Sequence, residues 1–227
     1  MILSARSTQR EQMDTDCVDF DDYSRCLRDL SRVNVVTMTH RPMLSWLAKQ
    51  ARDCPGFTLL DIACGHGDAL RRIRRRFPSA RLTGIDLNPW AKRAADAATD
   101  PADAIEFIND DAFAYKPDKP FDFIITSQFT HHLTDEQVVG FLVWLRGHAG
   151  RGWFIGDLQR HVIAYYGFPF LARIMFWHRF IREDGQISVA RSFTRAEWET
   201  HLSQAGITGE QVEIAWHFPF RLCVASR

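Results

Sequence analysis

The amino-acid sequence predicts an α/β fold built around a mostly parallel sheet. From residue 57 onward, short apolar runs alternate with longer segments of helical periodicity, a pattern typical of parallel strands joined by helices. Near the C-terminus, two strand-like runs are separated only by Phe218 and Pro219, which indicates a hairpin. We therefore expect a seven-stranded sheet with an antiparallel C-terminal hairpin strand, helices on both faces and a helical cap at the N-terminus.

The individual elements follow from local patterns. Thr134 with Gln137, and Thr194 with Glu197, have the spacing of capping boxes that begin helices. The expected strands cover residues 57–62, 81–85, 104–108, 121–126, 153–157, 211–217 and 220–225. The expected helices between them cover residues 67–76, 89–98, 134–148 and 194–205, with a long apolar helical region before the last of these.

The first 54 residues precede this alternation. Residues 1–15 are polar, and we expect them to form a disordered tail. From Val18 to Leu47, apolar residues recur at spacings of three and four, which predicts helix. A second helix is expected from Pro42 to Ala51, with the proline in its first turn. The predicted organisation is thus a tail and helical cap over residues 1–54, followed by one domain over residues 55–227.

Composition excludes several classes of protein. The chain has 227 residues, 46% of them hydrophobic, and a formal net charge of zero, so it can bury a full core but has no excess of basic charge for nucleic acid. The arginines between residues 71 and 76 are expected to form a solvated helix face. The five cysteines, one of which is Cys17, are scattered and form no CxxC pair, so neither a disulfide framework nor a metal is expected.

No segment of the chain has the pattern of a signal peptide or a membrane span. The N-terminus has no apolar core of signal-peptide length. The apolar segment from Val162 to Phe180 is interrupted by Gly167, Pro169 and Arg173, whereas a span needs about 20 nearly uninterrupted apolar residues. We therefore expect a cytoplasmic protein without a transmembrane segment. The oligomeric state stays open, and a homodimer is compatible with the sequence.

The segment from Leu59 to Gly67 carries the strongest functional signal. An apolar run ends in Asp61 and is followed by a turn in which Gly65 and Gly67 let the backbone approach a ligand closely. A second apolar run ends in Asp86. The turn lacks the three glycines of a dinucleotide fingerprint, and a carboxylate before it suits a cationic group better than a phosphate.

Four motifs in this order resemble those of the class I S-adenosylmethionine-dependent methyltransferases, over roughly residues 55 to 227. They are residues 59–67, Asp86, residues 110–113 and residues 121–128. The resemblance implies a Rossmann-like sheet that binds S-adenosylmethionine. It implies that Asp86 holds the ribose hydroxyls, and that Asp111, in preference to Asp110, contacts the adenine amino group. The implied cofactor-binding residues are Asp61, Ala63, Cys64, Gly65, Gly67, Asp86, Leu87, Asp110, Asp111, Ala112 and Ser127, with Arg41 as a candidate partner for the methionine carboxylate or a substrate acid.

Two histidines, His131 and His132, follow the fourth strand at the edge where the donor methyl would lie. A histidine can take a proton from a phenol near neutral pH, so both are candidate catalytic residues, with His131 preferred. The alternatives are a structural or helix-capping role and, more weakly, a metal site with Asp135.

The acceptor side is expected in residues 158–193, as a lid on the substrate side of the domain. Arg160 and His161 could meet a polar substituent, and Tyr165 and Tyr166 begin an aromatic-rich stretch that could cover an apolar ring. The alternative is that this stretch simply packs over the sheet.

The preferred function is O-methylation of a phenolic or quinone-like metabolite, such as a natural product, with histidine as the candidate base. One alternative is C-methylation, because the helical front end resembles that of quinone-biosynthesis methyltransferases. The others are a cofactor-binding protein that transfers no methyl group, or an enzyme that uses the sulfonium as an electrostatic catalyst. The sequence does not identify the acceptor.

Overall fold

The computed structural model describes residues 3–15 and 19–227. The described residues form one seven-stranded sheet in the order β3-β2-β1-β4-β5-β7-β6. Neighbours from β3 to β5 pair in parallel, and β7 runs antiparallel to both β5 and β6. The predicted fold class is therefore confirmed. The strands are β1 (Thr58–Ile62), β2 (Arg81–Asp86), β3 (Ile105–Asn109), β4 (Phe121–Ser127), β5 (Ala149–Leu158), β6 (Val212–His217) and β7 (Arg221–Ser226).

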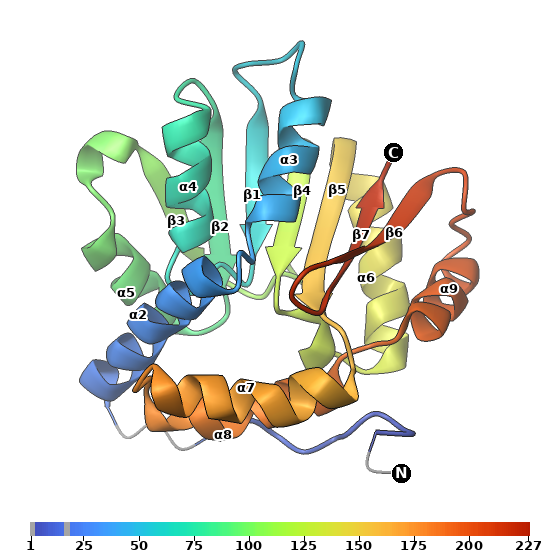
Figure 1. Ribbon diagram of the computed structural model, residues 1–227. Helices are drawn as coiled ribbons and strands as arrows, with labels where there is room; N and C mark the ends of the chain where they lie inside the picture. The colour runs from blue at the N-terminus through green and yellow to red at the C-terminus, as the bar shows by residue number, and fades with distance from the viewer. Residues whose placement is uncertain (1–2, 16–18) are drawn as a thin grey trace.

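Helices cover both faces of the sheet and its lower edge (Figure 1). Side chains of α3, α4 and α5 pack on one face, and side chains of α6 and α9 on the other. The remaining long helices, α2, α7 and α8, lie across the carboxyl ends of the strands (Figure 1). The helices are α1 (Gln12–Thr15), α2 (Phe20–Val36), α3 (Arg41–Gln50), α4 (Asp68–Arg76), α5 (Pro89–Ala98), α6 (Asp135–His148), α7 (Val162–Ile174), α8 (Arg179–Arg191) and α9 (Arg195–Gln204).

The central strands are buried on both faces. In β1, Leu60 and Ile62 face the α6 side, whereas Leu59 faces the α3 side. In β4, Ile124 faces the α6 side and Phe123 faces the α3 side. Strands covered by helices on both faces are uniformly apolar, so the polar residues at their ends are the exceptions. The fold thus places Asp61 and Ser127 at the carboxyl edge of a dry sheet.

The N-terminal segment differs from the expected disordered tail. Arg6 donates to the carbonyl oxygens of His131 and Leu133 at 3.1 and 2.7 Å and to that of Arg191 at 2.7 Å. Its guanidinium also pairs with Asp135 at 2.8 Å. One arginine therefore satisfies several carbonyls of distant segments, which a local sequence pattern does not reveal. The predicted helix start at Val18 and the cysteine at position 17 lie outside the described residues.

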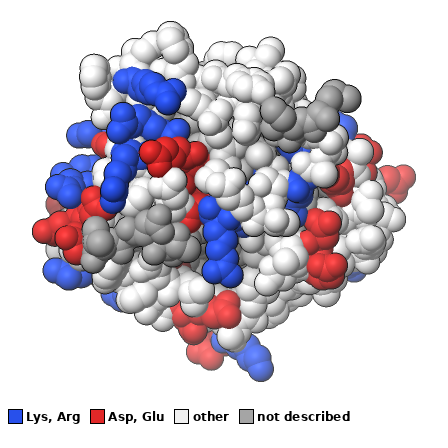
Figure 2. Space-filling model, turned by 90° about the horizontal axis from the view of Figure 1, so that it is seen from below, with Lys and Arg blue, Asp and Glu red and all other residues white. Residues whose placement is uncertain are grey.

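The long apolar region is two helices, α7 and α8, joined by a turn in which Phe176 has a φ of 52°. The lower face of the molecule, where they lie, is largely uncharged, with acidic and basic side chains at several separate places (Figure 2). Among the described residues, no helix is long and apolar enough to cross a membrane. No disulfide joins the four cysteines that the structure describes.

Candidate active site

The loop after β1 has an unusual backbone. Ala63, Gly65 and Gly67 all have positive φ, at 56°, 51° and 71°. Asp86, at the end of β2, holds this loop in place, because its Oδ2 accepts from the Gly65 amide at 2.9 Å. Its Oδ1 accepts from the Asn88 amide, also at 2.9 Å. Asp86, which ends the second strand, therefore anchors the loop that follows Asp61 and the first strand.

The loop also lines a cavity, which we call the cofactor-side cavity. Carboxylates concentrate around it. Asp61 is 2% exposed, and burial, reinforced by the charges of Asp68 and Asp86, raises its pKa well above the usual range. Burial also disfavours the charge of Asp68, but hydrogen bonds from His40 and Asn34 outweigh it and lower the pKa of Asp68 to about 2. A cation entering the cavity would relieve this concentration of negative charge.

The same cavity presents an unused polar atom. Ser127 lines it, and the buried Oγ of Ser127 has no hydrogen-bond partner within residues 3–15 and 19–227. Ala63, Cys64 and Gly65 line the cavity as well. Since buried polar groups are almost always paired, the orphan hydroxyl fits a site completed by a polar ligand such as the predicted cofactor.

The predicted adenosine-side residues gather at the adjoining edge of the sheet. The Asp110 amide donates to the Asp86 carbonyl at 3.2 Å, and Asn109 Nδ2 donates to the carbonyls of Asp86 and Leu87 at 2.9 and 2.8 Å. Asp110 and Asp111 are exposed, and Leu87 is 72% exposed. These side chains are therefore accessible beside Asp86, with Ala112 directly behind them in the chain.

Arg41 lies elsewhere. It is exposed and does not line the cavity with Asp61; it lines a surface hollow with Met38, Arg72 and Arg76 that shares Asn34 and His40 with that cavity. The reason is the turn between α2 and α3, in which Met38 has a φ of 51°. This turn directs His40, not Arg41, toward the cofactor-side cavity, where His40 Nε2 lies 2.8 Å from Asp68.

His131 is clamped between two carboxylates. Its ring is 2% exposed, with Nδ1 2.7 Å from Asp157 and Nε2 3.3 Å from Glu11. Burial disfavours the charged ring, but the two acids outweigh it and raise the pKa of His131 to about 10. The pKa values of Asp157 and Glu11 both fall to about 2, against the opposing effect of burial. His131 is therefore an imidazolium at neutral pH, which does not suit the predicted role of general base.

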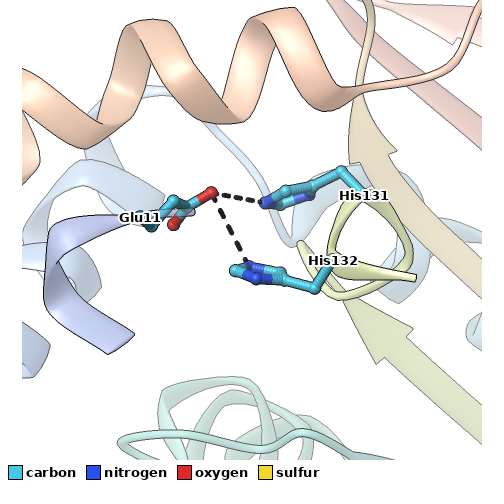
Figure 3. A group of neighbouring side chains, drawn as sticks. All are labelled: Glu11, His131 and His132. Carbon is cyan, nitrogen blue, oxygen red and sulfur yellow. Dashed lines mark ion pairs between the residues drawn. The ribbon is translucent and has the colours of Figure 1, made fainter. Parts of the chain in front are cut away.

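Glu11 reaches both histidines of the predicted pair (Figure 3). His132 Nε2 lies 3.8 Å from Glu11, and the His132 side chain is 28% exposed. Ligand atoms of Glu11, His131 and His132 all lie within 4.8 Å of one another, so a metal could bind there if it displaced the proton of His131. The alternative set with Asp135 is not assembled in this way, because Asp135 instead pairs with Arg6 at 2.8 Å.

A second cavity, of about 250 Å³, lies between α2, α7, α8 and the start of β7. Its lining is largely apolar and includes Leu30, Val33, Leu158, Phe168, Leu171 and Ile181. Leu30 and Gln128 line this cavity and the cofactor-side cavity alike. The two cavities are therefore neighbours, as a donor site and an acceptor site must be.

The four predicted substrate residues are not among the described residues that line this second cavity. Arg160 is 8% exposed and is bonded to Glu197 at 2.6 Å. His161 caps α7 through the Ile163 amide. On α7 the positions 163, 164, 167, 168 and 171 face the cavity, since residues three and four apart share a helix face. Tyr165 and Tyr166 lie off that face, and Tyr166 is 57% exposed.

Sequence reasoning also missed a polar chain between the cavities. Arg221 Nη1 donates to Gln128 Oε1 at 3.2 Å, and Gln128 Nε2 donates to Asn34 at 2.7 Å. Asn34 in turn donates to Asp68 at 3.2 Å. Gln128 lies within the predicted fourth motif and could have been found there. Its partners are 93 and 94 residues away in the chain, so no local pattern indicates them.

Residues 59–148 match the family model described as "Methyltransferase domain", and the fold and strand-end acids around it agree with that match. Residues 59–148 of this chain thus form a methyltransferase domain. Among curated proteins, this chain is 33% identical to trans-aconitate 2-methyltransferase of Streptomyces avermitilis over 96 residues, which is 41% of this chain and 31% of the relative. It is 33% identical to the 2-methyl-6-phytyl-1,4-hydroquinone methyltransferase of Synechocystis over 85 residues, which is 37% of this chain and 26% of the relative. The chain thus matches between a quarter and a third of the length of these relatives.

Solved structures extend the likeness in fold to nearly the whole chain. The plantazolicin methyltransferase BamL, in complex with a desmethylPZN analog and SAH, has a TM-score of 0.67 at 16% identity, over 90% of this chain and 73% of that one. Human N-acetylserotonin methyltransferase in complex with SAM has a TM-score of 0.64 at 17% identity, over 92% and 56%. At these identities the likeness establishes the shared fold.

The loop after β1 should be destabilised by any side chain at Gly67. A Cβ there would lie 2.7 Å from the Phe107 ring, and the φ of 71° disfavours any other residue. We expect Gly67→Ala to lower the free energy of unfolding by about 1–3 kcal/mol in urea titrations. Gly140→Ala is the matched control, because nothing lies within 4 Å of its Cβ position in α6; it should stabilise by about 0.5–1 kcal/mol. Equal effects of the two substitutions would contradict this account of the loop.

Proposed function

We propose that this protein transfers the methyl group of S-adenosylmethionine to an oxygen of a small, largely apolar aromatic acceptor. The observation that carries the proposal is the pair of adjoining cavities. One is lined by Asp61, Asp68 and an orphan hydroxyl, and the other is largely apolar. A cationic donor and an apolar acceptor would thus meet at their boundary, where Leu30 and Gln128 line both.

The residues of the first cavity fit the parts of the donor. The sulfonium supplies an electrophilic methyl group, so the protein needs to orient the two substrates and exclude water. Asp61 and Asp68 would favour the cationic methionine end. Asp86 would accept from the ribose hydroxyls, and Asp111 would accept from the adenine amino group. Ser127 would complete its hydrogen bonding on the methionine part.

The proposed acceptor follows from the lining of the second cavity. A volume of about 250 Å³ suits a compact molecule, and the rings of Phe168 and Phe220 offer aromatic contacts. Two similar proteins are named for a hydroquinone and for N-acetylserotonin, while a third is named for trans-aconitate. These names support a small-molecule methyl acceptor for this protein, but they do not identify which molecule it is.

His132 stays the candidate base, because it is partly exposed and adjoins Glu11, which lines the acceptor cavity. In this proposal, His131 positions Glu11 and does not itself accept a proton. If the kcat of the His132→Ala variant equals that of the parent from pH 6 to 9, His132 is not the base.

Methyl transfer can be tested by incubating the protein with S-adenosylmethionine and a panel of phenols and hydroquinones, with mass spectrometry of the products. We expect S-adenosylhomocysteine and a methylated acceptor to appear together. Filling the cavity with Ala164→Phe should then lower turnover at least 10-fold, since a bulky side chain would displace the acceptor, while cofactor affinity stays within about twofold.

The matched control is Ala196→Phe, at an exposed position of α9; it should leave turnover unchanged. Cofactor binding without any methylated product across the panel would instead favour a cofactor-binding protein that transfers no methyl group. Product formation that is equally fast in Ala164→Phe would remove the apolar cavity as the acceptor site.

A further inference from the structure

One charged side chain in the acceptor cavity makes hydrogen bonds only to neutral groups among the described residues. Arg221, the first residue of β7, is 3% exposed and lines the apolar cavity. A buried guanidinium is costly unless a counter-ion accompanies it. Packing in an apolar core alone therefore does not explain why a charged side chain is buried at this position.

The contacts of Arg221 hold the guanidinium without neutralising it. Nη2 donates to Thr37 Oγ1 at 3.0 Å and to Thr39 Oγ1 at 2.7 Å, and Nη1 donates to Gln128 Oε1. All of these acceptors are neutral. The buried Nε has no hydrogen-bond partner in the described part of the chain, and no carboxylate described there lies within 4.0 Å of the guanidinium. The guanidinium is thus held by neutral groups only, and the charge of Asp157 acts on it without a hydrogen bond or an ion pair.

The acids nearest to this cation are engaged elsewhere. Asp157 accepts from His131 and Thr130. Two carboxylates also line the cavity: Glu11 pairs with His131 at 3.3 Å, and Asp184 accepts from the amides of Gln12 and Met13. Each of these acids thus already accepts hydrogen bonds from the protein, whereas the Arg221 Nε–H still lacks an acceptor among the described residues.

We propose that Arg221 binds an anionic oxygen group of the methyl acceptor, so that the acceptor is a small apolar acid. The inference rests on the proposed function, since it treats this cavity as the acceptor site. Arg221 is a specificity-determining residue in this account. Its partner Gln128 lines both cavities, so an anion bound to Arg221 would lie at the boundary with the donor. The Thr37 and Thr39 hydroxyls pre-orient the guanidinium, which lowers the entropy lost on binding.

The test compares two probes of nearly identical shape, 2-naphthoate and its neutral amide 2-naphthamide. Their affinities are measured by isothermal titration calorimetry on the full chain with S-adenosylhomocysteine present. We expect naphthoate to bind at least 10-fold more tightly than naphthamide, because a charge-assisted pair replaces a neutral one. Arg221→Met should abolish this preference and leave naphthamide binding within about twofold.

Arg32→Met is the charge-matched control, because Arg32 is 65% exposed on α2 and pairs with Asp29; it should keep the preference. Arg221→Gln provides a second neutral variant that can still hydrogen-bond to Thr37 and Thr39. Near-UV circular dichroism and S-adenosylhomocysteine affinity establish that each variant is folded.

Equal binding of the two probes to the parent protein, or no binding of either, would overturn the inference. A preference that survives in a folded Arg221 variant would overturn it as well. The proposed function fails by a different result, namely the absence of methyl transfer. Neutral phenols that are methylated as fast as acids, with no preference for naphthoate, would leave the methyltransferase proposal standing and remove the role of Arg221.

Discussion

Asp86→Ala is expected to lower the affinity for S-adenosylhomocysteine by about 100- to 1,000-fold. In the proposed complex the carboxylate accepts from two ribose hydroxyls, and each hydrogen bond to a charged group contributes about 1.5–3 kcal/mol. Each 1.4 kcal/mol corresponds to a tenfold change in affinity. The substitution also removes the acceptor that holds the Gly65 amide at 2.9 Å, so the loop that faces the ligand loses its anchor. Isothermal titration calorimetry measures the effect directly.

Asp96→Ala provides the control for this experiment. Asp96 lies on the helix after Asp86, and its half-exposed side chain pairs with Lys92. An exposed pair of this kind contributes little, so cofactor affinity should be unchanged. If Asp86→Ala binds S-adenosylhomocysteine within tenfold of the parent protein, Asp86 does not hold the ribose.

The second large effect concerns stability and its dependence on pH. The pKa of His131 is raised to about 10 in the folded protein, above its ordinary value of 6.5. The stability that its charge contributes is therefore fully present below pH 6.5 and is lost as the pH rises through about 10. The lowered pKa values of Asp157 and Glu11, about 2, give a contribution that is present above pH 4.5 and is lost as the pH falls through about 2. The cluster thus stabilises most between about pH 4.5 and 6.5.

Asp157→Asn should lower the free energy of unfolding by about 3–5 kcal/mol at pH 6, because it breaks a buried ion pair and leaves His131 with one acid. Urea titrations at pH 6 and pH 9 measure this. The parent protein should lose stability between these two values, and His131→Gln should lose much less. His148→Gln, at the end of α6, is the control and should keep the parent's pH dependence. An unchanged pH dependence in His131→Gln would show that His131 is not charged in the folded state.

The donor side of the site could be predicted from local sequence because it consists of strand ends. Asp61 and Asp86 each end an apolar run, and the carboxyl ends of neighbouring parallel strands meet at one edge. In the structure, the loop that follows Asp61 is bonded to Asp86 through the Gly65 amide. The capping boxes of Thr134 and Thr194 were likewise predicted, and both are present, since each depends on residues only three positions apart.

The acceptor side could not be predicted in the same way. Arg160 and His161 follow a strand, as Asp61 and Asp86 do, yet Arg160 turns to Glu197 and His161 caps a helix. Tyr165 and Tyr166 lie outside the cavity because of the way α7 is rotated about its axis. This rotation depends on the packing of α7 against α8 and α2, and the apolar pattern of α7 alone does not reveal it. The raised pKa of His131 could not be predicted either, because it depends partly on Glu11, which lies in a segment that we expected to be disordered.

The local order of apolar runs, turns and acids thus predicted the sheet, the position of its strands along the chain and the edge where the donor is proposed to bind, because hydrophobic periodicity and strand-end chemistry act over a few residues. Tertiary structure alone decided which groups face the acceptor. Arg221 meets Gln128 across 93 residues and Thr37 across 184, and His131 meets Asp157 across 26. Contacts between such distant segments form only when the whole chain packs, so the charge of the acceptor cavity is a property of the fold and not of any one motif.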